Sequence, residues 1–156
     1  MKIKIIALGK IKEKFLKDGI EEFLKRLTPY ATIEIVELAP VEIKDENLIQ
    51  KSLEQEAEKI LANIKPNSYV ITMEILGKQL ASEDFAQKIN EITNLGISEL
   101  VFIIGSSYGI APSVSQRADF KLSFSKMTFL HQFARLLLVE QIYRAFKILK
   151  NETYHK

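Results

Sequence analysis

The sequence contains no cysteine and only two histidines, His131 and His155. The missing thiols exclude disulfide bonds, thiolate zinc sites, iron–sulfur clusters and cysteine nucleophiles, and such usage is typical of a reducing cytoplasm. Two histidines also argue against a histidine-built metal site, so we predict no metal. Long hydrophobic runs are missing too: Lys4 interrupts the apolar start of the chain and Gly9-Lys10 ends it, which excludes a signal peptide or membrane span there. We therefore expect a soluble, cytoplasmic protein.

Net charge is small, +2 from 22 basic and 20 acidic residues, but it is unevenly distributed along the 156 residues. Residues 1–17 carry a net +5, residues 18–99 a net −8, and residues 100–156 a net +5. Apolar residues make up 47% of the chain, which at this length predicts one globular domain over residues 1–156. The two basic ends would form one basic surface if the fold brings them together.

Strand and helix patterns alternate along the chain. The expected elements are strands at 1–8, 32–38, 69–75, 99–104 and 121–125, helices at 14–27, about 46–64 and about 82–95 with Ser82 as N-cap, and turns at Gly77-Lys78 and around Pro112. Several strands are continuous apolar runs, whereas 32–38 alternates apolar and charged residues, as an edge strand does. This order predicts an α/β domain with a mostly parallel sheet and helices on both faces.

The final helix, expected at 131–150, is apolar around its whole circumference rather than along one stripe. A helix of this kind must be buried on nearly every side. An outer helix of a small three-layer domain has one solvent face, so we predict that a second copy of the chain covers it in a homodimer.

Two glycine-bearing loops follow strands at the sheet edge where ligands bind in open α/β folds: 73–77 and 105–109. Neither matches a phosphate-binding motif, and on spacing alone each is better interpreted as a plain turn. The hydroxyls of 123–128 either form a ligand rim or cap a strand end. A serine hydrolase is not favoured, because no G-x-S-x-G elbow is present.

Near the C-terminus, Glu140 and Arg144 stand four residues apart and are expected to pair. Basic residues gather here with interleaved aromatic ones, a combination that suits RNA because charge holds phosphates and flat rings stack on bases. The members of this group are Arg135, Tyr143, Arg144, Lys147, Lys150, Tyr154, His155 and Lys156.

Taken as a set, these residues resemble the large-subunit ribosomal RNA methyltransferase H family of the knotted SPOUT superfamily. The matching segments are MKIKIIALGKIKEKF at the start, Lys25-Arg26-Leu27, Pro29-Tyr30, Ile104-Gly105, Leu122 to Thr128, His131-Gln132, Arg135, Glu140-Gln141, Tyr143 to Ala145 and Tyr154 to Lys156. The resemblance covers essentially the whole chain. It implies a C-terminal trefoil knot, which periodicity cannot reveal.

The resemblance also implies a function. Family members are homodimers that use S-adenosylmethionine to methylate N3 of a pseudouridine in 23S ribosomal RNA on the assembled ribosome. The implied partners are thus ribosomal RNA and a second copy of the chain, without DNA or a membrane. The implied cofactor-binding residues are Met73, Gly105, Phe124, Ser125, Lys126, Met127, Thr128 and Phe129. The rival interpretations are a non-catalytic ribosome-binding α/β protein and a flavodoxin-like nucleotide-binding module.

Methylation at N3 requires loss of a proton, so a base is needed. The candidate catalytic residues are His155, Glu140 and Arg144, and the candidate RNA-binding residues are Arg135, Tyr154 and Lys156. The sequence departs from the family pattern at Ser106, Leu130, Asn151 and Thr153. Asn tolerates a positive φ, so we expect Asn151 to keep the path of the tail where the family usually has glycine.

Overall fold

The computed structural model describes residues 1–156 as an α/β domain with a five-stranded, wholly parallel sheet. The strands are β1 (Lys2–Leu8), β2 (Thr32–Leu38), β3 (Tyr69–Gln79), β4 (Glu99–Ile104) and β5 (Phe120–Ser123). The helices are α1 (Lys14–Leu27), α2 (Ile49–Ala62) preceded by the 3-10 turn η1 (Glu46–Leu48), α3 (Ser82–Asn94), α4 (Pro112–Arg117) and α5 (His131–Leu149). The strand order is β2-β1-β4-β3-β5, so β2 lies at an edge, as its alternating sequence predicts.

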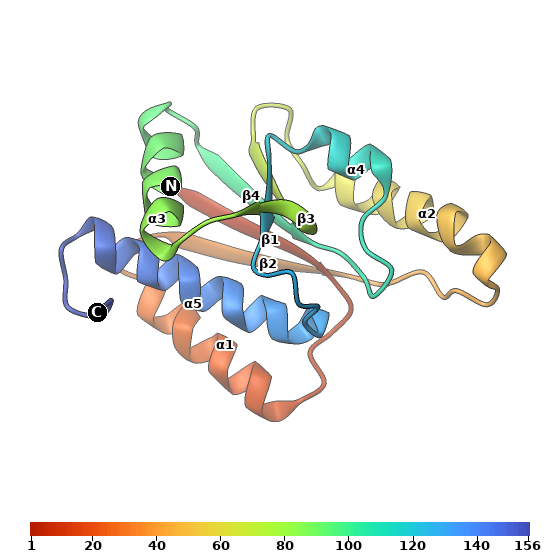
Figure 1. Ribbon diagram of the computed structural model, residues 1–156, viewed down its shortest axis with the longest axis horizontal. Coiled ribbons are helices and arrows are strands. Elements are labelled where there is room, and N and C mark those ends of the chain that lie inside the picture. The colour runs from red at the N-terminus through yellow and green to blue at the C-terminus, as the bar shows by residue number, and fades with distance from the viewer.

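Helices cover both faces of the sheet (Figure 1). The larger core packs α1, α3 and α5 against one face, and the smaller core packs α2 and α4 against the other. Alternate residues of the central strands enter opposite cores: Phe102 belongs to the first and Val101 and Ile103 to the second. Burial on both faces explains why these strands read as continuous apolar runs.

Helix α5 lies between α1 and α3 in the larger layer (Figure 1). These two neighbours cover much of the surface that made the helix apolar all round, and Phe133 is its one large apolar side chain that stays exposed. Packing within one chain therefore explains why α5 is apolar around most of its circumference. The homodimer stays a prediction and needs support from elsewhere on the surface.

The end of β3 differs from the sequence prediction. Gly77 and Lys78 continue the strand instead of forming a turn, and pairing with β5 shifts register between Met73 and Lys78. A Cβ on Gly77 would lie 2.8 Å from the Lys121 carbonyl oxygen, so this glycine permits a close backbone approach. In Figure 1 the yellow-green end of β3 passes in front of β5. The trefoil knot implied by the resemblance stays a prediction.

Two local predictions near the helix starts are wrong. Ala81, not Ser82, is the N-cap of α3, and the Ser82 hydroxyl instead donates to Gln141 Oε1 at 2.8 Å. Pro112 opens the short helix α4 rather than a turn, as proline often does at a first helical position. The last strand ends at Ser123, two residues earlier than expected.

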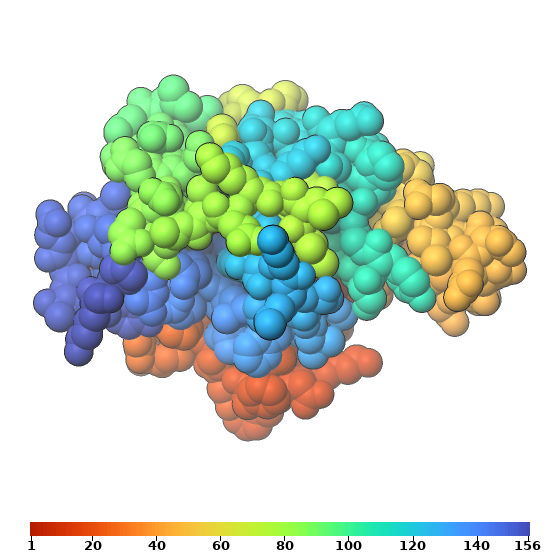
Figure 2. Space-filling model, viewed as in Figure 1, coloured from red at the N-terminus to blue at the C-terminus, as the bar shows by residue number.

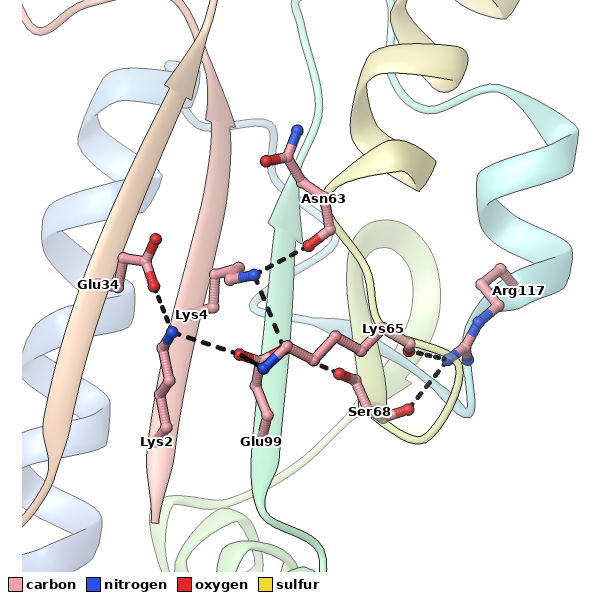
Figure 3. A network of polar contacts seen from close by, with 8 residues as sticks. All are labelled: Lys2, Lys4, Glu34, Asn63, Lys65, Ser68, Glu99 and Arg117. Atoms are coloured by element: carbon pink, nitrogen blue, oxygen red, sulfur yellow. Dashed lines mark hydrogen bonds and ion pairs between the residues drawn. The ribbon is translucent and has the colours of Figure 1, made fainter.

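The amino ends of β1 and β4 carry a polar network centred on Glu99 (Figure 3). Its carboxylate accepts a hydrogen bond from Ser68 Oγ at 2.8 Å and lies 3.7 Å from Lys4 Nζ and 3.6 Å from Lys2 Nζ. Burial acts to raise the pKa of Glu99, but the Ser68 hydrogen bond and the nearby lysine charges outweigh burial and hold this pKa below its ordinary value. This network joins β1 and β4 at their amino ends, which is the end of the sheet opposite the carboxyl ends of the strands. No helix of the structure has the length and hydropathy needed to cross a bilayer.

Candidate functional site

A cavity of about 760 Å³ lies at the carboxyl ends of β4 and β5, beside the part of β3 that follows its pairing with β4. Three segments form it: residues 73–76 of β3, the loop 104–110 after β4, and residues 122–131 that lead from β5 into α5. In Figure 2 these yellow-green, teal and blue segments lie together on one face of the molecule. The position agrees with the general rule that open parallel sheets bind ligands outside the carboxyl ends of their strands.

The loop after β4 owes its shape to its glycines. Ser106 O accepts a hydrogen bond from Gly109 N at 2.9 Å, and Gly109 has φ of +90°. A Cβ on Gly105 would lie 2.5 Å from Gly109 O, so only glycine lets the loop close. Ser106 has no positive φ, so this departure from the family pattern causes no backbone strain of that kind. The loop is both the predicted tight turn and a wall of the cavity.

Hydroxyl groups shape the segment after β5. Ser123 Oγ donates to Ser125 O at 3.0 Å, and Ser125 Oγ accepts from Met127 N at 3.0 Å. These bonds are the local side-chain-to-backbone type that stabilises turns. The hydroxyls thus cap the strand end and hold the apolar side chains of Met127 and Phe129 at the cavity.

The cavity brings together seven of the eight residues that the resemblance implies for cofactor binding. Met73, Gly105, Phe124, Ser125, Met127, Thr128 and Phe129 line it, and Lys126 does not.

The predicted site did not include Glu74 and His131, which the structure places in the cavity lining. Glu74 is held by hydrogen bonds from Thr72 Oγ1 at 2.6 Å and Ser115 Oγ at 3.0 Å. His131 opens α5, and burial first, then the Arg135 charge, lowers its pKa. Glu74 directly follows Met73, and His131 belongs to the same motif as the other predicted residues, so position in the motif was the available signal.

A second polar group, the tail cluster, gathers Glu83, Glu140, Arg144, Tyr154 and His155. Arg144 donates to Glu140 Oε1 from Nη2 at 2.5 Å and from Nε at 3.1 Å, which confirms the expected pair. Tyr154 OH donates to the same oxygen at 2.9 Å. Burial and this hydrogen bond raise the pKa of the Tyr154 phenol. The structure therefore joins three candidate residues from the end of α5 and the tail.

The tail follows a fixed path along its own chain. Asn151 has φ of +54°, which confirms the expected positive value, and it turns the chain after α5. Glu152 then accepts hydrogen bonds from Lys147 Nζ at 2.5 Å and from Tyr30 OH at 2.6 Å. The Tyr154 ring packs edge-on against Tyr143, with centroids 4.8 Å apart. These contacts hold the terminal residues against α5 and α1.

The tail cluster and the cavity are separate within one chain, since no member of the cluster lines the cavity. A smaller hollow of about 300 Å³ lies beside the cavity, shares four of its lining residues and reaches Ser82 and Gln141. Gln141 in turn donates to Glu140 Oε2 at 3.0 Å. A path of side chains therefore leads from the cavity towards the cluster without joining them.

Arg135 does not occupy a surface suited to RNA. Its residue is 2% exposed, and its guanidinium donates to Glu37 Oε2 at 2.5 Å and to Gly9 O at 3.1 Å. A buried, paired arginine fixes the loop after β1 against α5, so the RNA-binding prediction fails for this residue. Lys156 is exposed, and Tyr154 is half-buried.

Comparison with known proteins places the chain in one family. The family model described as "Predicted SPOUT methyltransferase" matches residues 1–155. The chain belongs to this family. Ribosomal RNA large subunit methyltransferase H of Carboxydothermus hydrogenoformans is 52% identical over 164 residues, covering both chains completely. A Methanococcus maripaludis protein that carries the same name with a provisional qualifier is 50% identical over 159 residues, again over the whole of both chains.

Membership of the SPOUT methyltransferase family confirms the resemblance inferred from the sequence and agrees with the wholly parallel α/β fold. Identities of 50% and more over complete chains leave room for differences at single positions.

Proposed function

We propose that this SPOUT-family chain is an S-adenosylmethionine-dependent methyltransferase that modifies N3 of a pseudouridine in 23S ribosomal RNA on the assembled ribosome. The main support is the cavity itself: one hollow at the carboxyl ends of the strands collects seven of the eight residues implied for the cofactor. The names of the two relatives support ribosomal RNA as the substrate class.

The residues present fit this cofactor. A volume of about 760 Å³ lies within the range of cofactor sites, and the lining is mostly apolar with a few polar groups. Ser106 Oγ is buried in the wall without a hydrogen-bond partner, which is unusual for a polar atom unless a ligand supplies one. Phe124, Met127 and Phe129 offer apolar surface for an adenine ring. When bound, the cofactor supplies an electrophilic methyl group on a sulfonium.

The tail cluster supplies groups for the RNA base. N3 must lose its proton, and a neutral imidazole such as that of His155 accepts one at an unprotonated ring nitrogen. Glu140 accepts four hydrogen bonds, two of them from Arg144, so its role is to hold Arg144 and Tyr154 in place rather than to take the proton. Arg144 brings a positive charge that stabilises the anionic base. Tyr154 and Lys156 are the proposed RNA contacts.

A homodimer would unite cavity and cluster. Large apolar side chains surround the cavity mouth and are exposed, with Leu76 99%, Met127 75% and Leu130 60% accessible. Patches of this kind mark interaction surfaces. We propose that the partner subunit covers this rim and brings its own tail to the cavity, so that each active site combines residues of two chains.

The function is tested by incubating the protein with ribosomes and isotopically labelled S-adenosylmethionine, followed by mapping of the labelled nucleotide. The expected result is a single labelled pseudouridine in 23S ribosomal RNA. Calorimetry with S-adenosylmethionine gives the second measurement. Binding without methyl transfer would favour a different substrate, and absence of binding would favour a non-catalytic ribosome-binding protein or a nucleotide-binding module.

A further inference from the structure

The tail cluster closes into a ring through the first turn of α3. Starting from Ser82, the contacts run to Gln141 at 2.8 Å, on to Glu140 at 3.0 Å, then to Arg144 at 2.5 Å. From Arg144 Nη1 the next contact is His155 Nδ1 at 3.1 Å, and His155 Nε2 lies 2.8 Å from Glu83 Oε1. Glu83 follows Ser82 in sequence, so the ring joins α3, α5 and the tail.

The donors in this ring determine the tautomer of His155. An arginine only donates hydrogen bonds, so Nδ1 must present its lone pair to Arg144. An ionised carboxylate only accepts, so Nε2 must carry the proton that Glu83 receives. The His155 hydrogen bond also lowers the pKa of Glu83, which keeps this carboxylate ionised. The neutral Nε2–H tautomer is thus the form that satisfies both neighbours.

We propose that Glu83 is a positioning residue for methyl transfer: by accepting from His155 Nε2, it fixes the orientation of the imidazole and the tautomer in which Nδ1 carries the lone pair. Nδ1 is then the nitrogen that takes the N3 proton, once the RNA base displaces Arg144 from it. This inference rests on the proposed function. The geometry resembles that of other active sites in which a carboxylate orients a histidine. Without Glu83, the imidazole keeps only its contact with Arg144 and can rotate about it.

A comparison with Asp84 distinguishes this role of Glu83 from a general stabilisation of the start of α3. Both carboxylates lie in the first turn of α3, where a negative charge stabilises the helix through its dipole. Only Glu83 contacts another element, whereas Asp84 is exposed and makes no hydrogen bond or ion pair. A change that acts through helix stability therefore affects both positions, and a change that acts through His155 affects Glu83 alone.

The test compares Glu83→Ala, Glu83→Gln and Asp84→Ala in single-turnover methylation of ribosomes, with cofactor affinity measured by calorimetry. For Glu83→Ala we expect a rate lower by roughly tenfold to a hundredfold, the cost of misplacing a reacting group by about an ångström. Cofactor affinity should stay unchanged. Glu83→Gln keeps an oxygen acceptor and should restore most of the rate, and Asp84→Ala should match the wild type.

NMR of ¹⁵N-labelled protein gives a second readout that needs no activity. With only two histidines, His131 serves as an internal reference. We expect a protected His155 Nε2–H resonance in the wild type and in Glu83→Gln, and its loss to exchange in Glu83→Ala. If the wild type methylates ribosomes, two results would overturn this inference and leave the proposed function standing. One is full activity of Glu83→Ala, and the other is the absence of the His155 Nε2–H resonance from the wild-type spectrum. A wild type that transfers no methyl group to ribosomes would overturn the proposed function, and the inference with it.

Discussion

Glu99 offers a sharp test of how the fold is held at the end opposite the cavity (Figure 3). Glu99→Gln keeps the size of the side chain and a hydrogen-bond partner for Ser68, but removes the charge that faces Lys4. Lys4 is 8% exposed and keeps only the Asn63 carbonyl, 2.9 Å from its Nζ. The variant therefore leaves a buried ammonium without its counter-charge.

The magnitude follows from the separation and burial of the pair. At 3.7 Å the Lys4–Glu99 attraction amounts to about 4 kcal/mol at an effective dielectric constant of about 20. Relief of the carboxylate's desolvation offsets part of this loss, while breaking buried pairs typically costs about 3–5 kcal/mol. The lysine retains one hydrogen bond, so we expect a loss of about 3 kcal/mol, which corresponds to a Tm lower by about 6–12 °C.

The assay is urea denaturation at neutral pH, with Glu34→Gln as the matched control. Glu34 lies 2.6 Å from Lys2, but its side chain is 44% exposed, so its removal should change stability little. Adding Lys4→Met to Glu99→Gln should recover part of the loss, because the uncompensated charge disappears. Equal stability of the Glu99→Gln and Glu34→Gln variants would refute the reasoning.

The pH dependence of stability independently checks the direction in which the pKa of Glu99 is shifted. The pKa of Glu99 is lower in the folded state than its ordinary value of 4.5, so its contribution is complete above that value. This contribution disappears as the pH falls through the lower folded-state pKa. The stability difference between wild type and Glu99→Gln should therefore narrow in acid; a difference that widens there would contradict the assignment.

Three further predictions concern the tail and the cavity rim. Deletion of Tyr154 to Lys156 should abolish RNA methylation and spare cofactor binding by calorimetry; full activity in the truncated chain would remove the tail from the mechanism. Leu76→Lys should convert a dimer to monomers in sedimentation equilibrium, whereas Leu95→Lys, at an equally apolar exposed position away from the cavity, should not; monomeric wild type would contradict the dimer. Asn151→Ala should lower the free energy of unfolding by about 1 kcal/mol and Asn151→Gly should leave it nearly unchanged, because alanine tolerates a positive φ poorly; equal stability of the two variants would show that this strain is absent.

The order and type of most elements could be predicted from the sequence, because each depends on a local apolar pattern. The strand 99–104 and the helix 14–27 match the structure to the residue. The errors lie where contacts with a distant segment of the chain determine the local structure. Gly77 continues a strand because the Lys121 backbone lies against it, and Ser82 gives its hydroxyl to Gln141, 59 residues away.

The candidate site depended on the family resemblance far more than on local pattern. Spacing alone favoured plain turns for both glycine loops, and that interpretation is correct for 105–109 as local geometry. Nothing local shows that the same turn lines a cavity with two other segments. Arg135 is the opposite case: its charge in a basic region predicted an RNA contact, but the residue is 2% exposed and pairs with Glu37, 98 residues away.

The uneven distribution of charge along the chain does not translate directly into charged surfaces. In the basic N-terminal segment, Lys2 and Lys4 are engaged with Glu34 and Glu99 at the amino ends of the strands. Arg135 and Lys147 in the C-terminal segment are paired as well. Much of each basic end is therefore already neutralised by carboxylates: those of the acidic middle for Lys2, Lys4 and Arg135, and Glu152 of the same C-terminal segment for Lys147. Fewer cations remain for RNA than the sequence count indicates, so RNA binding depends more strongly on the proposed dimer.

The separation of the cavity from the tail cluster is a second reason to expect a dimer. Methyl transfer requires the acceptor atom, its base and the methyl donor within a few ångströms of one another. In one chain, Glu140 and Arg144 of the cluster lie in the middle and carboxyl half of α5, while its amino end contributes His131 to the cavity. At 1.5 Å of rise per residue, the separation of nine positions from His131 to Glu140 corresponds to about 14 Å along the helix. A single chain with this fixed tail path holds the two groups apart, so the proposed dimer would have to place the cluster of one chain beside the cavity of its partner.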